Sequence, residues 1–102
     1  METFNDIIAS PLPVLVDFYA DWCGPCKAMN PVITETARQL EGKARVIKVN
    51  IDKAENAAIK YQVQAVPTFI LFKNGEIVWR HSGMIDKKNL LQIIESKSPD
   101  QS

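Results

Sequence analysis

One six-residue segment, residues 14–19, limits what this chain can fold into more than any other. Its letters are VLVDFY, so apolar side chains fall on both faces of an extended strand, and only Asp17 is polar. A strand with one face in water alternates apolar and polar residues, whereas a strand covered on both faces is apolar throughout. The segment therefore predicts a central strand in a sheet with helices on both sides, which is an α/β fold.

Helical and extended patterns alternate along the rest of the chain. The Asn74-Gly75 step separates two strand-like runs and is a strong hairpin signal, so the last two strands are expected to be antiparallel. A strand, a helix and a second strand in succession imply a parallel pair at the start of the sheet. We therefore expect a four-stranded mixed sheet. Helices are predicted to start at Thr3 and Asp86 and to cover residues 23–41 and 55–61, with further strands over residues 45–50, 68–72 and 77–79.

A chain of 102 residues has room for one core, so residues 1–102 are expected to form a single domain with a frayed polar tail at 98–102. Twelve basic and twelve acidic residues give no electrostatic reason to bind nucleic acid or a membrane surface. No apolar stretch approaches the roughly 20 residues that cross a bilayer, and the first residues lack a signal-peptide pattern. If Met1 is the natural start, the protein is expected in the cytoplasm.

The only cysteines lie in the stretch Cys23-Gly24-Pro25-Cys26, directly after the central strand. A disulfide between them closes too short a loop to restrain the unfolded chain much, so the pair indicates chemistry. Cys23 falls at the first turn of the predicted helix, where free N–H groups and the helix dipole favour a thiolate. Cys23 is therefore the expected nucleophile. Cys26, one helical turn on and turned inward, is the expected resolving thiol.

Two plainer interpretations of these cysteines are open at this point. They could be ordinary core residues that happen to lie close together, or half of a zinc site. A zinc site needs two more ligands, and the single histidine, His81, lies far along the chain with no cysteine beside it. The position of the pair between a strand and a helix favours redox chemistry, and no metal site is expected.

Asp17 is an acid in the middle of the apolar central strand, where burial would raise its pKa. Such a group near a dithiol can accept or return the proton of the resolving thiol. The alternative is an acid at a strand edge that a backbone group or a lysine satisfies. Lys48 lies in the adjacent predicted strand, and it either pairs with Asp17 or points to water.

The stretch around the cysteines resembles the active-site signature of the thioredoxin family. The resemblance implies a thioredoxin fold and a protein disulfide reductase with no cofactor besides its redox-active Cys23–Cys26 disulfide. It also implies protein disulfide substrates, a monomeric chain, and recharging by a thioredoxin reductase that uses NADPH. The matching segments run in order through the chain: Trp22-Cys23-Gly24-Pro25-Cys26-Lys27, preceded by Val16-Asp17-Phe18 and followed by Pro31, Lys48-Val49-Asn50-Ile51-Asp52, Val66-Pro67-Thr68, Phe72-Lys73-Asn74-Gly75 and Gly83.

The same resemblance assigns roles to individual residues. Residue chemistry alone leaves the Val66–Pro67 bond trans, because few X–Pro bonds are cis, whereas the family likeness implies a cis bond against the dithiol. It also implies that Asp17 is a buried proton-transfer acid with Lys48 close to it. The docking surface that it implies for substrates consists of Trp22, Gly24, Pro25, Ile51, Val66, Pro67, Gly83 and Met84.

The sequence departs from the family pattern at two places. Tyr19 stands where many relatives carry a second tryptophan, and the sequence starts at the first helix, without the N-terminal edge strand of usual thioredoxins. The N-terminal edge strand is therefore expected to be missing, which leaves four strands and an exposed sheet edge that could pair with another chain.

Two other functions compete with the reductase. Disulfide oxidants and isomerases of this family often carry a histidine between the cysteines, and Gly24-Pro25 contains none, which favours a reductant. The second alternative is a partner-binding thioredoxin module in which the exposed surface around Trp22 holds another protein and the dithiol is incidental. The sequence leaves this alternative open.

Overall fold

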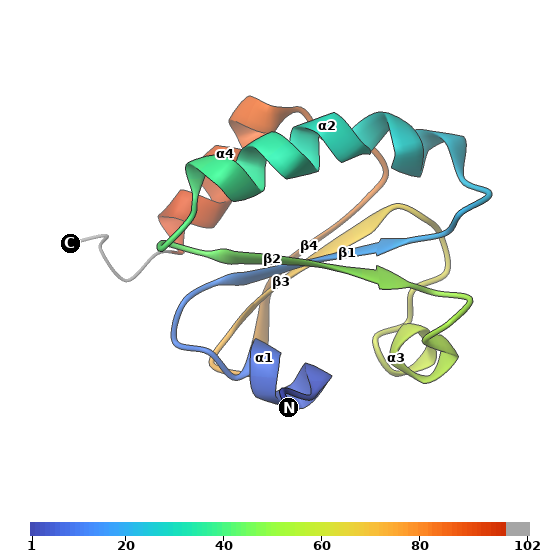
Figure 1. Ribbon diagram of the computed structural model, residues 1–102, viewed down its shortest axis with the longest axis horizontal. Helices are drawn as coiled ribbons and strands as arrows, with labels where there is room; N and C mark the ends of the chain where they lie inside the picture. Colours follow the sequence, from blue (N-terminus) through green and yellow to red (C-terminus); the bar gives the residue numbers. More distant parts are fainter. Residues whose placement is uncertain (98–102) are drawn as a thin grey trace.

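The computed structural model describes residues 1–97, in which helices and strands follow one another in the predicted order (Figure 1). The predicted frayed tail, residues 98–102, lies outside the described residues. The helices are α1 (Phe4–Ile8), α2 (Gly24–Gln39), α3 (Glu55–Lys60) and α4 (Lys87–Ser96). The strands are β1 (Val14–Tyr19), β2 (Arg45–Asn50), β3 (Thr68–Lys73) and β4 (Glu76–Ser82).

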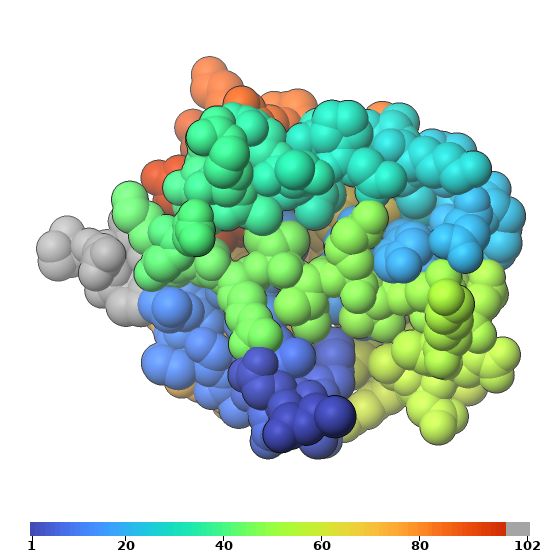
Figure 2. Space-filling model, viewed as in Figure 1, coloured from blue at the N-terminus to red at the C-terminus, as the bar shows by residue number. Residues whose placement is uncertain are grey.

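The four strands form one mixed sheet in the order β2-β1-β3-β4, which confirms the predicted fold class. β1 is parallel to β2 and antiparallel to β3, and β4 is antiparallel to β3. β1 therefore lies inside the sheet, as its apolar run predicted, and only its last residue, Tyr19, is not fully buried. β2 has a free edge in the described part of the chain, and its side chains reach the surface between α2 and the N-terminal segment (Figure 2).

Side chains of β1 alternate between the two faces of the sheet, and each face is covered by its own pair of helices (Figure 1). Leu15 belongs to a core with Met29 of α2 and Leu90 of α4. Phe18 belongs to a second core, on the opposite side, with Ile8 of α1. We call these two sides the α2 face and the α1 face.

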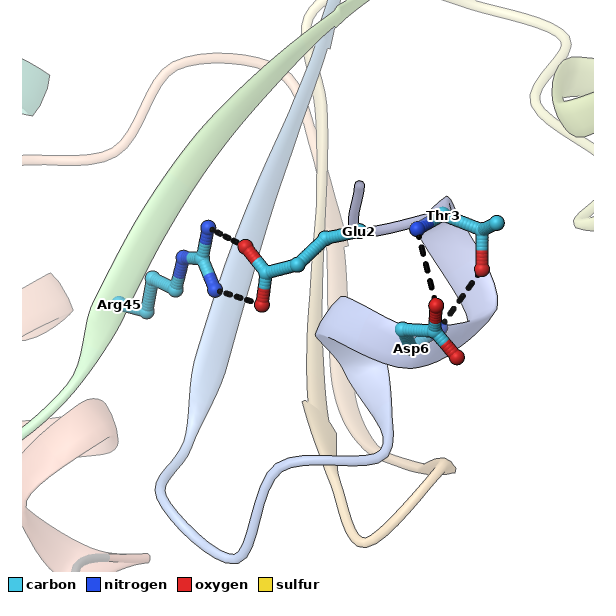
Figure 3. Close-up of polar contacts among 4 residues, drawn as sticks. All are labelled: Glu2, Thr3, Asp6 and Arg45. Atoms are coloured by element: carbon cyan, nitrogen blue, oxygen red, sulfur yellow. Dashed lines mark hydrogen bonds and ion pairs between the residues drawn. The ribbon is translucent and has the colours of Figure 1, made fainter.

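Polar contacts hold the N-terminal segment to the molecule (Figure 3). The Thr3 hydroxyl accepts the Asp6 N–H, and the Asp6 carboxylate accepts the Thr3 N–H, both at 3.1 Å. This capping box begins α1 at the predicted place. Both carboxylate oxygens of Glu2 accept hydrogen bonds from the Arg45 guanidinium, at 2.7 and 3.0 Å. The residues before α1 are thereby tied to the first residue of the edge strand β2.

The observed ends of two elements, α2 and β4, differ from the prediction by two residues or more. α2 ends two residues early, at Gln39, because the N–H groups of Lys43 and Ala44 both donate to the Leu40 carbonyl and Gly42 turns the chain with φ of +84°. β4 covers seven residues, whereas three were predicted, because its polar residues also pair with β3. Patterns of apolar residues show where an element packs but do not fix the residues at which its exposed ends lie.

Two local signals were correct. Asn74 and Gly75 form the turn of the β3–β4 hairpin with φ of +54° and +81°. Positive φ at both central residues is the geometry that an Asn-Gly step favours in a two-residue hairpin. Asp86 is the N-cap of α4, and its carboxylate accepts the Asn89 N–H at 3.2 Å.

Candidate active site

Cys23 and Cys26 lie at the junction of β1 and α2, where a disulfide joins them with their Cα atoms 5.3 Å apart. Cys23 is the N-cap residue of α2, and its Sγ accepts the Cys26 N–H at 3.1 Å. Free backbone N–H groups and the positive end of the helix dipole meet at this position. A thiolate on Cys23 is therefore stabilised once the disulfide is reduced.

Burial does not distinguish the two cysteines. Cys26 is buried as expected, but Cys23 is equally buried, and each has 4% of its surface exposed. The two differ in their place on the helix, since Cys23 precedes the first turn and Cys26 lies within it. Cys26 also borders a cavity of about 490 Å³ between α2 and the ends of β1 and β2. Only Cys23 is the N-cap residue of α2.

The segment before β3 forms one wall of the site. Its Val66–Pro67 peptide bond is cis, as the family resemblance implied and residue chemistry alone did not. The Val66 carbonyl oxygen lies 3.6 Å from the Cys23 Sγ. Val66 and Ile51 also pack on the buried cluster that the two cysteines form with Ala20. Backbone groups of this wall are therefore within reach of whatever binds beside Cys23.

Asp17 is buried in the middle of β1 with 1% of its surface exposed, and its Oδ1 has no hydrogen-bond partner in the described part of the chain. It points to the α2 face, because alternate residues of a strand share a side and Leu15 packs there. Burial raises the pKa of Asp17 to about 6, and the positive charge of Lys48 partly offsets this rise. A carboxyl group with this pKa exchanges protons close to neutral pH.

Lys48 is opposite Asp17 in the register of β1 and β2, but no ion pair joins them in residues 1–97. The Lys48 Nζ instead donates to Asn30 Oδ1 of α2 at 2.7 Å and lies 4.7 Å from the centre of the Tyr19 ring. These three residues line the cavity that Cys26 borders. Of the two interpretations of Lys48 from sequence, an ion pair with Asp17 is absent from the described residues, whereas the exposed side chain agrees with the interpretation that it points to water.

The residues predicted to dock substrates surround the dithiol with different exposure. Trp22 and Met84 are the large apolar members, with 69% and 55% of their surfaces exposed. The Trp22 Nε1 donates to Asp52 Oδ2 at 3.0 Å, which holds the indole. The Gly83 N–H donates to the Pro67 carbonyl at 2.8 Å and joins the loop after β4 to the cis segment. Of the other members, Gly24 and Pro25 are exposed, Ile51 and Val66 are half-buried, and Pro67 is buried.

Comparison with known proteins gives one consistent result. The thioredoxin family model matches residues 1–96. A thioredoxin of Rickettsia conorii is 46% identical over 90 residues, which cover 88% of this chain and 86% of that relative. The chain belongs to the thioredoxin family. Thioredoxin 1 of Chlorobaculum tepidum is 42% identical over 94 residues, or 91% of this chain and 93% of the relative. A solved structure of a mutant thioredoxin from Halobacterium salinarum NRC-1 superposes with a TM-score of 0.85 at 40% identity, over 92% of this chain and 81% of that one.

Membership of the thioredoxin family identifies the chain as an oxidoreductase that reduces protein disulfides. The four-stranded sheet with helices on both sides agrees with the fold of the thioredoxin structure to which it is similar. The Cys23–Cys26 disulfide lies where such a reductase needs it, at the start of α2. No finding favours an oxidant, an isomerase or a binding module without redox activity.

Two residues of the thioredoxin site escaped the sequence analysis. Asn30 lies four residues after Cys26 and therefore on the same side of α2, so helical spacing could have placed it beside the dithiol. Its hydrogen bond to Lys48 joins a helix to a strand, and no pattern in the neighbouring sequence indicates this contact. Asp52 holds Trp22 across 30 residues of sequence. It belonged to a matching segment, but nothing near it in the chain indicated this contact.

Within residues 1–97, no group of three or more histidine, cysteine, aspartate or glutamate side chains lies close enough to hold a metal ion. The only two cysteines are joined to each other. Over the same range, no helix has both the length and the apolar character that a membrane crossing requires.

Proposed function

We propose that Cys23 is the nucleophile and Cys26 the resolving thiol of this thioredoxin-family reductase. The observation that carries the proposal is the position of Cys23 as N-cap of α2, with the Cys26 N–H 3.1 Å from its Sγ. This N–H and the helix dipole favour the thiolate form of a cysteine at that position, and the thiolate is the form that attacks disulfides. Cys26 is the third residue of α2, farther from the end of the helix dipole, so a thiolate there is stabilised less.

Two exchange steps transfer the electrons. The Cys23 thiolate attacks one sulfur of a target disulfide, and the other target sulfur leaves as a thiolate. Cys26 then loses its proton and attacks the Cys23 Sγ, which closes the Cys23–Cys26 disulfide and releases the first target sulfur as a thiolate. Two electrons pass to the target, whose two sulfurs take up protons, and the dithiol is oxidised.

Asp17 is proposed as the group that accepts the Cys26 proton before the second step. Its burial, its unpartnered Oδ1 and its pKa of about 6 support this role, because a base is most effective when its pKa lies near the working pH. Lys48 is proposed to stabilise the Asp17 carboxylate from a distance. Its bond to Asn30 keeps its charge at the cavity beside Cys26.

Substrates are proposed to lie against the surface around the dithiol and to be proteins with an accessible disulfide. A thioredoxin reductase that uses NADPH is the proposed source of electrons, with no cofactor besides the dithiol. The chain is proposed to act as a monomer in the cytoplasm. The proposed docking surface consists of Trp22, Gly24, Pro25, Ile51, Val66, Pro67, Gly83 and Met84.

Matched serine substitutions test the two cysteine roles. Cys23→Ser should reduce insulin no faster than dithiothreitol alone does, because no nucleophile is left. Cys26→Ser keeps the nucleophile but lacks the thiol that releases the target, so it should accumulate a covalent mixed disulfide. Mass spectrometry without reductant detects that adduct. Capture of the target by Cys23→Ser in place of Cys26→Ser would reverse the assignment.

The direction of electron flow is tested separately through the reduction potential of the dithiol, read from Trp22 fluorescence in dithiothreitol buffers. A value near about −270 mV, which is typical of thioredoxins, is expected for a reductant. A value of about −180 to −120 mV would indicate an oxidant or isomerase instead.

A further inference from the structure

His81 of β4 contacts the loop that follows its strand. Its ring is stacked on Trp79 with the planes parallel and the ring centres 5.8 Å apart. Its Nε2 lies 3.1 Å from the Met84 carbonyl oxygen. A carbonyl oxygen only accepts hydrogen bonds, so Nε2 carries the hydrogen and donates it. Stacking on Trp79 holds the His81 ring in place, and the hydrogen bond from that ring holds the loop at Met84.

The loop that His81 contacts is hydrogen-bonded to the segment before β3, which forms the wall beside the dithiol. The Gly83 N–H donates to the Pro67 carbonyl at 2.8 Å, and Val66, one residue earlier, places its carbonyl 3.6 Å from the Cys23 Sγ. Gly83 has φ of +98°, so the chain bends sharply between this contact and Met84. The bend leaves the Met84 side chain 55% exposed.

The two sides of this bend are anchored differently. Before it, the Ser82 and Thr68 hydroxyl oxygens are 3.1 Å apart and β4 pairs with β3 up to Ser82. After it, the hydrogen bond from His81 is the only one to the Met84 carbonyl among the described residues. Ile85, the next residue, packs on the core of the α2 face, so the position of Met84 relative to the cis segment is set by this packing and by the hydrogen bond from His81.

We propose that His81 is a positioning residue for protein substrates, which holds Met84 where an extended substrate segment can place an apolar side chain against it. The inference rests on the proposed docking of substrates beside Cys23. His81 takes no part in the exchange of sulfur bonds. Its effect should therefore appear in the KM for a protein disulfide and be absent for a disulfide too small to reach Met84.

Two substitutions separate the stack from the hydrogen bond. His81→Phe keeps an aromatic ring on Trp79 but has no donor, and its KM for insulin should rise about fivefold at unchanged kcat, since that is the factor one ordinary hydrogen bond represents. His81→Gln keeps an N–H donor without the ring and should restore the KM to within about twofold. Thermal unfolding of both variants shows that each is folded. Hydroxyethyl disulfide serves as the small substrate, and its KM should stay within about twofold in both variants.

Each contrary result overturns the proposal. An unchanged insulin KM in His81→Phe would show that Met84 needs no anchor. An equal loss with insulin and hydroxyethyl disulfide would place the effect at the dithiol, and failure of His81→Gln to restore the KM would remove the hydrogen bond as the cause. A failure of the proposed function itself would be distinct, because the unaltered chain would then not reduce insulin.

Discussion

Under α2 and α4 the sheet buries a carboxyl group and borders a cavity, whereas no carboxyl group of the described residues is buried in the apolar and aromatic core under α1 and α3. On the α1 face, the Tyr61 ring contacts the rings of Phe4, Phe18 and Phe72, with centres 5.2 to 6.4 Å apart. On the α2 face, the Asp17 Oδ1 has no hydrogen-bond partner among residues 1–97. The same strands supply both faces.

The comparison shows how one strand can serve folding and chemistry together. Neighbouring residues of β1 point to opposite sides, so Asp17 can be buried on the α2 face while Phe18 completes the α1 face. The α1 face adds to the free energy of unfolding, and the buried acid subtracts from it. Truncation of an apolar side chain on the α1 face should therefore lower the free energy of unfolding, whereas replacement of the buried acid on the α2 face should raise it.

Phe18→Ala has the largest expected effect, because it opens the α1 face. Phe18 is completely buried, and removal of a buried phenylalanine ring costs about 3 to 5 kcal/mol. Urea denaturation measures the loss. Insulin reduction by the folded variant should change by less than about twofold, since the dithiol belongs to a separate cluster. A large loss of activity in the folded variant would mean that the two faces are coupled.

Asp17→Asn should act in the opposite direction and raise the free energy of unfolding of the disulfide form by about 3 kcal/mol at pH 8. The pKa of Asp17 is about 6 in the folded chain against 3.8 for an ordinary aspartate, so the folded state holds the proton more tightly. Stability therefore falls as the pH rises from about 4 to about 6, and the loss is complete above that range. The amide cannot ionise, so its advantage should shrink to less than about 1 kcal/mol at pH 4.

Urea denaturation at pH 4 and pH 8 checks this sign, with the exposed Glu41→Gln as the control carboxyl substitution. The same Asp17→Asn variant should resolve mixed disulfides more slowly, by up to about 10²-fold, which is the lower end of what a positioned base contributes. Equal stabilisation at both pH values would show that the pKa of Asp17 is the same in the folded and unfolded chain, and so that burial does not raise it.

Lys48→Met should have a smaller effect on the same face. It removes the positive charge that partly offsets the rise in the Asp17 pKa, so that pKa should rise further. The pH range over which stability falls should move upward, but modestly, because Lys48 is exposed and water screens its charge. Unfolding midpoints across pH measure the shift, with the exposed Lys43→Met as control. A downward shift would contradict the electrostatic role of Lys48.

Glu2→Gln is expected to have the smallest effect, because it breaks a contact that belongs to neither face (Figure 3). The side chains of Glu2 and Arg45 are 57% and 45% exposed, and exposed ion pairs contribute little to stability. The thermal midpoint at about 0.15 M salt should not change measurably. A clear drop would show that the N-terminal segment supports the free edge of β2.

Most of the fold could be predicted from sequence, because the signals for its elements are local. The apolar run around Asp17 identified the central strand, and Asn74-Gly75 identified the hairpin turn. Exposed strand ends were missed, since polar residues there pair through the backbone without an apolar pattern. In the site, the order of the cysteines on the helix was predictable, but the equal burial of Cys23 and Cys26 was not. That burial depends on residues from other elements that pack over the dithiol.

The sequence by itself determined the elements, the two-sided character of β1 and the presence of a dithiol at the start of a helix. Periodicity, capping and short spacings encode these features within a few residues. Only the tertiary structure decided that Lys48 bonds to Asn30, that Trp22 bonds to Asp52, and that His81 holds the Met84 carbonyl in a loop joined to Pro67. The first contact joins a strand to a helix, the second joins two turns 30 residues apart, and the last depends on how the loop after β4 folds back. Each is therefore set by packing and has no pattern in the local sequence.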